Sequence, residues 1–371
     1  MMNTPRFLGD LNQRSIEVIR DGQHASGGYV ASPTFSQYPF SWLRDGSYIA
    51  MAMAATGDRD SSARFYDWVA RVVLAHEADV QAVIADLAAG KPADPAHLLP
   101  ARFTLEGERE PRTGEDDWPN FQLDGYGTWL FGLHSHYAGV LPEGRDDLRV
   151  AVELTVAYLR ATWHLPCYDY WEEFGDRQHT STLAAIVAGL QAAAVLLHDE
   201  SVQELADEVW QYVLDTCVVD GSFVKGPQDD RVDASLLSLA VPFGLVTTSD
   251  ATFERTLARI RSELSSPTGG IRRYVGDTYY GGSPWILHTA WLGWVDRIAG
   301  NAEAAAHAKA WIEECALPES GFLPEQRTSE PQEGAEAYVQ EWEERWGTVA
   351  TPLLWSHAKY LLLQFGAVTA W

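Results

Sequence analysis

The stretch "LAAIVAGLQAAAVLL", residues 183–197, decides the fold class, because it has the length of a helix and is apolar on every side. A surface helix carries one apolar stripe, whereas a helix that is apolar all round has to be buried among other elements. Gln191 interrupts the run, which is also shorter than the roughly 20 residues of a membrane span. With Ser181 or Thr182 as its cap, the stretch predicts a core helix.

Helices of a second kind follow this core helix in the sequence. Residues 250–264 and 302–315 are amphipathic, with one charged face. Helical periodicity dominates the chain, and the alternation typical of strands is scarce. The periodicity predicts about twelve helices, over 8–21, 45–56, 61–87, 125–139, 146–162, 180–198, 200–216, 232–240, 250–264, 284–299, 302–315 and 351–366.

Alternation of buried and half-exposed helices predicts two concentric rings, the all-α (α/α)6 toroid. No linker rich in proline, glycine or serine divides the chain, so we expect a single domain over residues 1–371. Polar stretches at 107–117 and 327–345 are predicted to be long loops.

Composition excludes several classes of protein. Apolar residues make up 46% of the 371 residues, which excludes wholesale disorder. The formal charge of −25 repels phosphate backbones and anionic membranes, so we expect neither a nucleic-acid nor a membrane partner. Three scattered cysteines predict neither a disulfide framework nor a metal site. The first residues lack the pattern of a secretory signal, from which we expect a cytoplasmic protein.

Tryptophan is unusually frequent, with 15 copies, several of which stand beside charges in "SWLRDG", "DDWPN", "DYWEE" and "GSPWI". Flat rings stack on the C–H faces of sugars while neighbouring charges bind the hydroxyls, so this pattern favours a carbohydrate site. The alternative is that the rings only fill a large core.

The segment "YPFSWLRDGSYIAMAM", residues 38–53, places Arg44 and Asp45 at the start of an apolar helix. We interpret them as a fork that binds two neighbouring hydroxyls, with Tyr38 and Trp42 as walls. Alternatively, Asp45 is a helix cap and Arg44 its surface partner.

In "DDWPNFQLDGYGTWLFGL", residues 116–133, Trp118 stands where it can stack on a ligand, and Gln122 and Asp124 precede a helix. Asp124 is alternatively only an N-cap.

Two acids, Glu172 and Glu173, follow three aromatic residues in "YDYWEEFGDRQHTS", residues 168–181. The apolar setting predicts a desolvated Glu172 with a raised pKa, as a general acid near neutral pH requires. The alternative is a solvated turn. The same tripeptide, Trp-Glu-Glu, returns at 342–344 in an acidic segment.

Two later segments complete the set. "GGIRRYVGDTYYGGSPWILHTAW", residues 269–291, contains Arg273 and Trp285 among five glycines but matches no phosphate-binding pattern, which favours a loop that faces a sugar. In "SGFLPEQ", residues 320–326, Glu325 follows a proline in an apolar setting. The chain has neither a GxSxG nor an HExxH motif, so triad and metal catalysis are not predicted.

Together these segments resemble the catalytic domain of family 15 glycoside hydrolases, the glucoamylase and glucodextranase family, over residues 8–367. The most specific match is "RYVGDTYYGGSPW", and "SWLRD", "YDYWEE", "VDASLL", "PEQ" and "TPLLWSHAKY" follow the family's order. The resemblance implies an (α/α)6 toroid with a funnel at one end. The implied reaction removes glucose from non-reducing ends with inversion and releases β-glucose.

By position, the resemblance implies that Glu172 is the general acid and Glu325 the general base. It also implies that Arg44 and Asp45 hold the terminal glucose between the walls Tyr38 and Trp42. Further positions match residues of the first two sugar sites, namely Trp118, Glu173, Arg273 and Trp285. Gln122 and Asp124 match supporting positions. No cofactor or metal is implied.

The acidic insert at 327–350 departs from simpler members of the family and is expected to be either a lid over the funnel or a solvated loop. Without a signal or a polymer-anchoring module, the expected substrate is a small-molecule oligosaccharide. Isomaltose and isomalto-oligosaccharides come first, and maltose and malto-oligosaccharides second. Rival interpretations are a trehalase of the same family and a non-catalytic toroid that binds sugar or a partner protein. The sequence predicts no particular oligomeric state.

Overall fold

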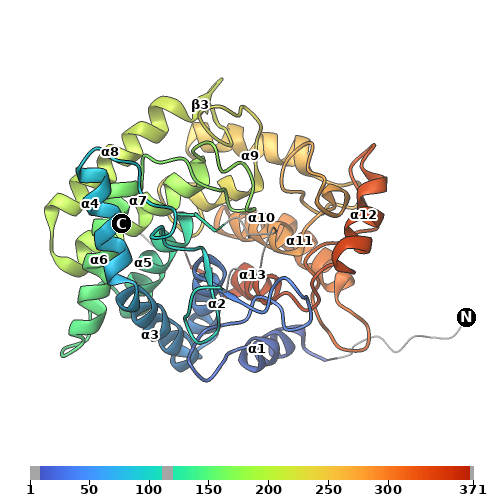
Figure 1. The fold of residues 1–371 in the computed structure, drawn as a ribbon. Helices are drawn as coiled ribbons and strands as arrows, with labels where there is room; N and C mark the ends of the chain where they lie inside the picture. The colour runs from blue at the N-terminus through green and yellow to red at the C-terminus, as the bar shows by residue number, and fades with distance from the viewer. Residues whose placement is uncertain (1–8, 111–119, 368–371) are drawn as a thin grey trace, which may run out of the picture.

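The computed structural model describes residues 9–110 and 120–367. In these residues, six elements form a closed inner ring, in which each contacts the next and the last returns to the first (Figure 1). In ring order they are α2 (Leu43–Ala55), α5 (Asp124–Tyr137), α7 (Thr180–Leu197), η1 (Ala234–Leu239), α10 (Ile286–Ile298) and α13 (Leu354–Phe365).

An outer ring of helices surrounds the inner one (Figure 1). Along the chain, an outer helix precedes or follows each inner element. The members of the outer ring are α1 (Leu11–Asp21), α3 (Arg59–Ala75), α6 (Asp146–Thr162), α8 (Glu200–Thr216), α9 (Ala251–Leu264) and α11 (Ala302–Cys315). They are amphipathic, and each buries its apolar stripe against the inner ring or a neighbouring element. The predicted (α/α)6 toroid is therefore confirmed.

The inner ring is tightly packed where α5 crosses α7. A Cβ atom added at Gly127 would lie 2.1 Å from the carbonyl oxygen of Ala185, and one at Gly189 would lie 2.4 Å from the carbonyl oxygen of Gly127. Only glycine permits such a close approach of two backbones. Helix α7 is apolar enough and long enough to cross a membrane, but 83% of its apolar window is buried among the other elements.

Three predicted elements need correction. The single helix expected over 61–87 is two helices, α3 and α4 (Glu77–Ala88), because His76 leaves the helical conformation with φ −105° and ψ 18°. This bend lets α4 lie against α6 while α3 also packs on α2. The element expected over 232–240 is the short 3₁₀ helix η1, which ends before Pro242, a residue that cannot continue a helix.

The third correction concerns the stretch 327–345, which was expected to be a loop. Half of it forms α12 (Glu336–Trp346), which lies outside both rings and packs on the short helix η2 (Tyr279–Gly282). The residues of α12 are mostly strong helix formers, so local propensity explains the helix although little of it is buried.

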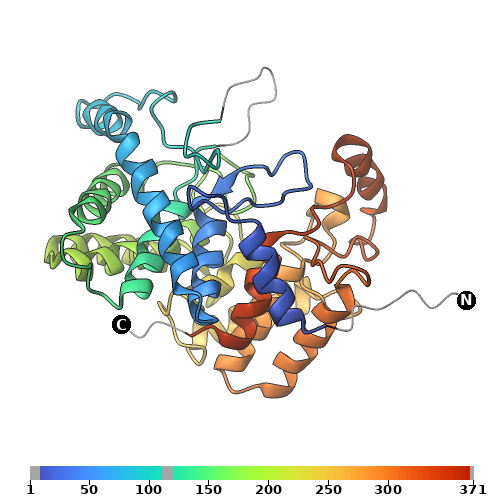
Figure 2. The ribbon, with the colours of Figure 1, turned by 90° about the horizontal axis from the view of Figure 1, so that it is seen from below.

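Short strands brace the connections between helices. Strand β1 (Ser41–Trp42) pairs antiparallel with β2 (Arg102–Phe103), so that Trp42 lies opposite Arg102. Strand β3 (Val218–Val219) pairs antiparallel with β4 (Ser222–Phe223). The segments that lead into the inner ring gather at one end of the toroid, where residues 91–110 and α12 both project beyond the two rings (Figure 2).

Candidate active site

A cavity of about 560 Å³ opens at the end of the toroid where these segments meet. Its walls are mostly aromatic and charged side chains, which suits a ligand that has both C–H faces and hydroxyls. The predicted site residues that line it are Tyr38, Trp42, Arg44, Asp45, Glu172, Glu173, Arg273, Trp285 and Glu325. Trp118, also predicted, lies outside the described residues.

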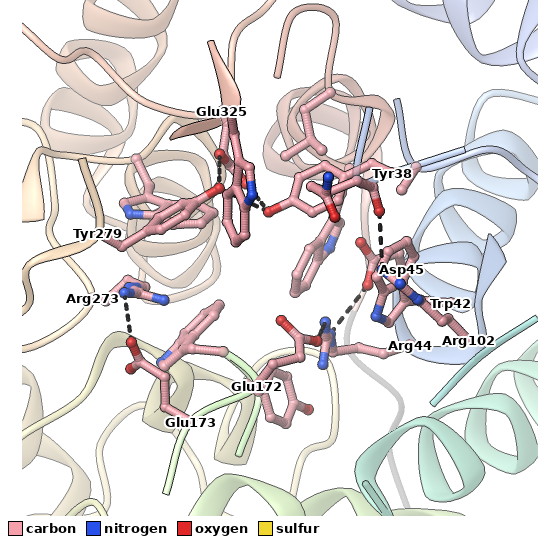
Figure 3. A pocket seen from close by; sticks show the side chains of 18 of the residues that line it. Tyr38, Trp42, Arg44, Asp45, Arg102, Glu172, Glu173, Arg273, Tyr279 and Glu325 are labelled. Atoms are coloured by element: carbon pink, nitrogen blue, oxygen red, sulfur yellow. Dashed lines mark hydrogen bonds and ion pairs between the residues drawn. The ribbon is translucent and has the colours of Figure 1, made fainter. Parts of the chain in front are cut away.

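Two carboxyl groups face each other across the cavity (Figure 3). Glu172 comes from the loop that leads into α7, and Glu325 comes from the segment between α11 and α12. They are 153 positions apart by their residue numbers, and ring closure brings them to one site. Glu325 is buried, whereas the side chain of Glu172 is partly exposed toward the cavity, and protein groups hold each of them.

Glu172 lies in a strained turn and has φ +60°, an uncommon conformation for a residue with a side chain. Its Oε1 accepts hydrogen bonds from Arg44 Nη2 and Gln122 Nε2, both at 3.1 Å. No hydrogen bond from the described residues reaches Oε2, which is therefore the oxygen available to a ligand. Burial raises the pKa of this carboxyl, although Arg44 and Gln122 oppose the rise.

Glu325 is only 2% exposed and is bracketed by two tyrosines. The hydroxyl of Tyr38 donates to Oε1 and that of Tyr279 donates to Oε2, each at 3.3 Å, while the two hydroxyls lie 3.0 Å apart. Its backbone is fixed as well, because its N–H donates to the Ala350 carbonyl and its carbonyl accepts from Ile286 at the start of α10. Burial raises the pKa of Glu325 to about 8, against the lowering effect of Arg273 and the two hydroxyls.

Arg44 holds together the side of the cavity near α2. Its guanidinium donates to Asp45 at 3.2 Å, Gln122 at 3.0 Å and Asp124 at 3.2 Å, besides Glu172. Gln122 and Asp124 do not line the cavity; Asp124 acts on it through Arg44, and Gln122 acts through Arg44 and through its own hydrogen bond to Glu172. Most of the donors of Arg44 are thus committed to protein groups, and its predicted contact with a sugar hydroxyl stays a prediction.

Asp45 stands in the first turn of α2 and is 6% exposed. The N-terminus of a helix favours a negative charge. Even so, burial raises the pKa of Asp45 to about 7, with Arg44 as the opposing influence. Asp45 and Trp42 both line the cavity, and the predicted contact of Asp45 with a sugar hydroxyl stays a prediction.

Glu173 forms a second charged wall with Arg273. Arg273 Nη2 donates to Glu173 Oε1 at 3.2 Å, and the Tyr274 hydroxyl donates to Oε2 at 2.5 Å. Arg273 is itself held by Asp277, which accepts from Nε at 2.7 Å. Both Glu173 and Arg273 line the cavity, as predicted from the sequence.

A buried ionic cluster supports the loop that carries Glu172. Lys225 Nζ lies between Asp169 Oδ2 at 2.7 Å and Asp233 Oδ2 at 2.5 Å. Asp169 Oδ1 accepts the backbone N–H groups of Trp171 and Glu173, both at 2.9 Å. Burial lowers the pKa of Lys225, but the two carboxylates outweigh it and raise the pKa above its ordinary value.

This cluster also holds the tryptophan of the loop. Asp233 accepts from Trp171 Nε1 at 3.0 Å and caps η1 through the backbone N–H of Ser235. The turn that presents Glu172 is therefore attached on both sides to an ion pair below the cavity.

Several cavity residues were missed by the sequence analysis. Tyr279 belongs to a segment that was singled out, but nothing local indicates that its hydroxyl reaches Glu325. Arg102 lines the cavity next to Trp42, its partner in the β1–β2 pairing. Its guanidinium donates to Glu110 at 2.6 and 2.8 Å. Trp355 stacks under Arg44, with 5.0 Å between the guanidinium carbon and the ring centroid. Its signal was the matched motif "TPLLWSHAKY".

Comparison with known proteins agrees with this geometry. Residues 11–310 match the family described as Glycosyl hydrolases family 15. The isomaltose glucohydrolase of Kribbella flavida is 40% identical over 368 residues, which cover 96% of this chain and 92% of that protein. A substituted glycosidase solved in complex with glucose superposes with a TM-score of 0.86 at 38% identity, over 95% of both chains.

A bacterial glucoamylase complexed with acarbose shares the fold, with a TM-score of 0.72 and 21% identity over 96% of this chain and 55% of that one. The family match spans most of the chain and includes the segments of Arg44, Glu172 and Arg273. The chain therefore belongs to family 15 of the glycosyl hydrolases and is a glycoside hydrolase that acts on a sugar substrate.

Proposed function

We propose that this enzyme is an exo-acting, inverting α-glucosidase that releases β-D-glucose from the non-reducing ends of short α-glucosides. Isomaltose and isomalto-oligosaccharides are the proposed substrates ahead of malto-oligosaccharides. The observation that carries this proposal is the pair of carboxyl groups, Glu172 and Glu325, on opposite sides of one aromatic cavity (Figure 3). The named activity of the Kribbella flavida relative supports the choice of isomaltose.

Glu172 is the proposed general acid. Its carboxyl has a raised pKa and an oxygen, Oε2, that is available to the substrate. It protonates the glycosidic oxygen as the bond from that oxygen to C1 breaks, so the leaving sugar departs with a new hydroxyl. Arg44 and Gln122 then stabilise the carboxylate that remains.

Glu325 is the proposed general base. As a carboxylate it takes a proton from a water molecule, whose oxygen attacks C1 from the face opposite the leaving group. Inverting enzymes separate the two carboxyls by roughly 6.5–9.5 Å to admit this water. Tyr38 and Tyr279 hold Glu325 in place from either side. After turnover, proton exchange with solvent returns a proton to Glu172 and removes one from Glu325.

The remaining site residues have proposed binding roles. Asp45 and Arg44 bind the terminal glucose between Tyr38 and Trp42, with Gln122 and Asp124 as supports of Arg44. Glu173, Arg273 and Trp285 line the cavity and are proposed to contact the first two sugar rings. Trp118 is proposed for the same role from the sequence alone. We also propose a cytoplasmic location, which the three free cysteines support.

Time-resolved proton NMR with isomaltose, maltose and trehalose in parallel tests the reaction and ranks the linkages. We expect β-glucose to appear first, before mutarotation, and fastest from isomaltose. Early α-glucose would contradict the assigned roles of the two carboxyls. Fastest turnover of trehalose would identify a trehalase instead, and no turnover in any tube would favour a sugar-binding protein without this activity.

A further inference from the structure

Helix α12, which has no assigned role, contributes side chains to the cavity. None of its residues is buried by the rest of the protein. Yet Trp342 and Trp346 are spaced four residues apart, which places them on one face of the helix. Both line the cavity together with Arg345, and we call these three residues the α12 wall. An apolar helix face that the protein leaves half-exposed at the mouth of a cavity is suited to contact with a ligand.

The rings of the α12 wall form one continuous surface with the site. The centroids of Trp342 and Trp346 lie 4.8 Å apart, and the guanidinium of Arg345 lies 5.2 and 4.8 Å from them. Trp342 in turn lies 5.2 Å from Tyr279, whose hydroxyl donates to Glu325. The wall therefore begins one aromatic ring away from the proposed general base.

Specific contacts dock α12 against the protein. Trp342 Nε1 donates to the Thr278 carbonyl at 3.1 Å, and the Tyr280 hydroxyl donates to the Gly347 carbonyl at 2.7 Å. Gln332, before the helix, donates to the Tyr274 carbonyl at 2.9 Å. These bonds tie Trp342 and the residues that flank α12 to residues 274–280, so the wall is held in a defined position.

Trp346 extends the wall to the far side of the cavity mouth. Its ring meets the edge of Phe35 at 6.3 Å, and Phe35 belongs to the segment that leads to α2. The α12 wall thus spans from the η2 segment to the segment before the Arg44 helix. Since Trp342 and Trp346 line the cavity, a ligand longer than one sugar ring can reach these rings.

We propose that the α12 wall binds the second sugar ring of the substrate, the ring that leaves after cleavage; this inference rests on the function proposed above. The first sugar occupies the end of the cavity at Asp45, and the scissile bond lies between Glu172 and Glu325. The next ring then extends toward the wall, where Trp342 and Trp346 stack on its C–H faces and Arg345 donates to its hydroxyls. The segment 327–350 is in this view part of the binding site.

The decisive experiment compares two substrates that differ only in the leaving group. Isomaltose has a second sugar ring, whereas α-D-glucosyl fluoride fills the first sugar position and releases fluoride. In the double variant Trp342→Ala/Trp346→Ala, we expect kcat/KM for isomaltose to fall about tenfold while the value for the fluoride changes less than about twofold. Tyr338→Ala is the matched control, since Tyr338 is an exposed aromatic residue of α12 that does not line the cavity.

Two results would overturn the inference. An equal loss with both substrates would mean that α12 supports the site without binding the second ring. An unchanged kcat/KM for isomaltose would mean that the second ring does not reach the wall. A retained rate with the fluoride also demonstrates that the double variant is folded.

A binding measurement separates this inference from the proposed reaction. In the Glu172→Gln background, calorimetric titration gives the Kd of isomaltose and of glucose without turnover. Adding Trp342→Ala/Trp346→Ala is expected to weaken isomaltose about tenfold and to leave glucose within about twofold. Equal changes for the two sugars would contradict the inference. A wild-type enzyme that binds isomaltose through the wall but releases no glucose would contradict only the proposed reaction.

Discussion

The tripeptide Trp-Glu-Glu occurs twice in this enzyme and has two different structures. At 171–173 it lies in a turn with a buried tryptophan and half-buried acids, whose backbone is held by Asp169 and whose tryptophan is held by Asp233. At 342–344 it lies on α12, with the tryptophan directed to the cavity and both acids exposed. Identical residues thus form a candidate catalytic turn in one place and a binding surface in the other, because their surroundings differ.

Desolvation explains why only the first copy is suited to acid catalysis. Burial raises the pKa of Glu172 and of Glu173, and Arg44 or Arg273 keeps each in a fixed orientation. Exposed acids on a helix surface lose no hydration and interact weakly with their neighbours. The comparison teaches that the tripeptide alone is no signal of catalysis. The surroundings of the tripeptide decide whether its acids are desolvated.

The largest effect is expected from Glu172→Gln, which removes the proposed proton donor but keeps the shape of the side chain. General acid catalysis contributes about 10²–10⁴-fold, so kcat for isomaltose should fall by that factor. With α-D-glucosyl fluoride the loss should be smaller, since fluoride leaves without protonation. Glu343→Gln, at the corresponding position of the second copy, is the matched control, and a similar loss in both variants would contradict the contrast between the two copies.

A second large effect is expected from Lys225→Met, which leaves Asp169 and Asp233 buried without their counter-ion. Breaking a buried ion pair on one side costs about 3–5 kcal/mol, so the free energy of unfolding should fall by that amount in urea titrations. Lys309→Met is the control, because Lys309 pairs with Glu313 at the surface, where about 0–1 kcal/mol is expected. Equal losses of unfolding free energy in the two variants would contradict a stabilising role of the Lys225 cluster at the turn 171–173.

A smaller effect is expected in the pH profile of Tyr279→Phe. The hydrogen bond from Tyr279 stabilises the charged form of Glu325 and so lowers its pKa. Without that bond the pKa rises, and the acidic limb of kcat/KM should move to higher pH by up to about one unit. Tyr280→Phe is the control, since the Tyr280 hydroxyl donates to the Gly347 carbonyl instead. A shift toward lower pH would refute the assignment of Glu325 as the base.

The smallest effect is expected from the double variant Glu343→Gln/Glu344→Gln in the second copy. Surface substitutions of this kind change stability by about 0.5 kcal/mol or less. Since neither acid lines the cavity, kcat/KM for isomaltose should stay within about twofold of the wild-type value. Steady-state kinetics and thermal melting check both statements, and a tenfold loss would give the second copy a role beyond its tryptophan.

Local sequence determined which segments are helices and which helices are buried. The apolar run of α7 and the amphipathic pattern of α9 each show their environment within one segment, because helix periodicity repeats every few residues. The matched motifs likewise predicted that Arg44, Glu172 and Glu325 belong to one site. The break at His76 was missed because it depends on the packing of α4 against α6. Helix α12 was missed because its polar composition indicated a loop, although most of its residues are strong helix formers.

Only the tertiary structure decided how the site residues meet. Closure of the inner ring brings the segments before α2, α7, α10 and α13 to one end, and no local pattern contains that distance information. For this reason the Lys225 cluster, the contact of Tyr279 with Glu325, and the arrangement of α12 at the cavity could not be read from the sequence. The chemistry of each side chain is local, whereas its pKa and its partners depend on residues far away in the chain.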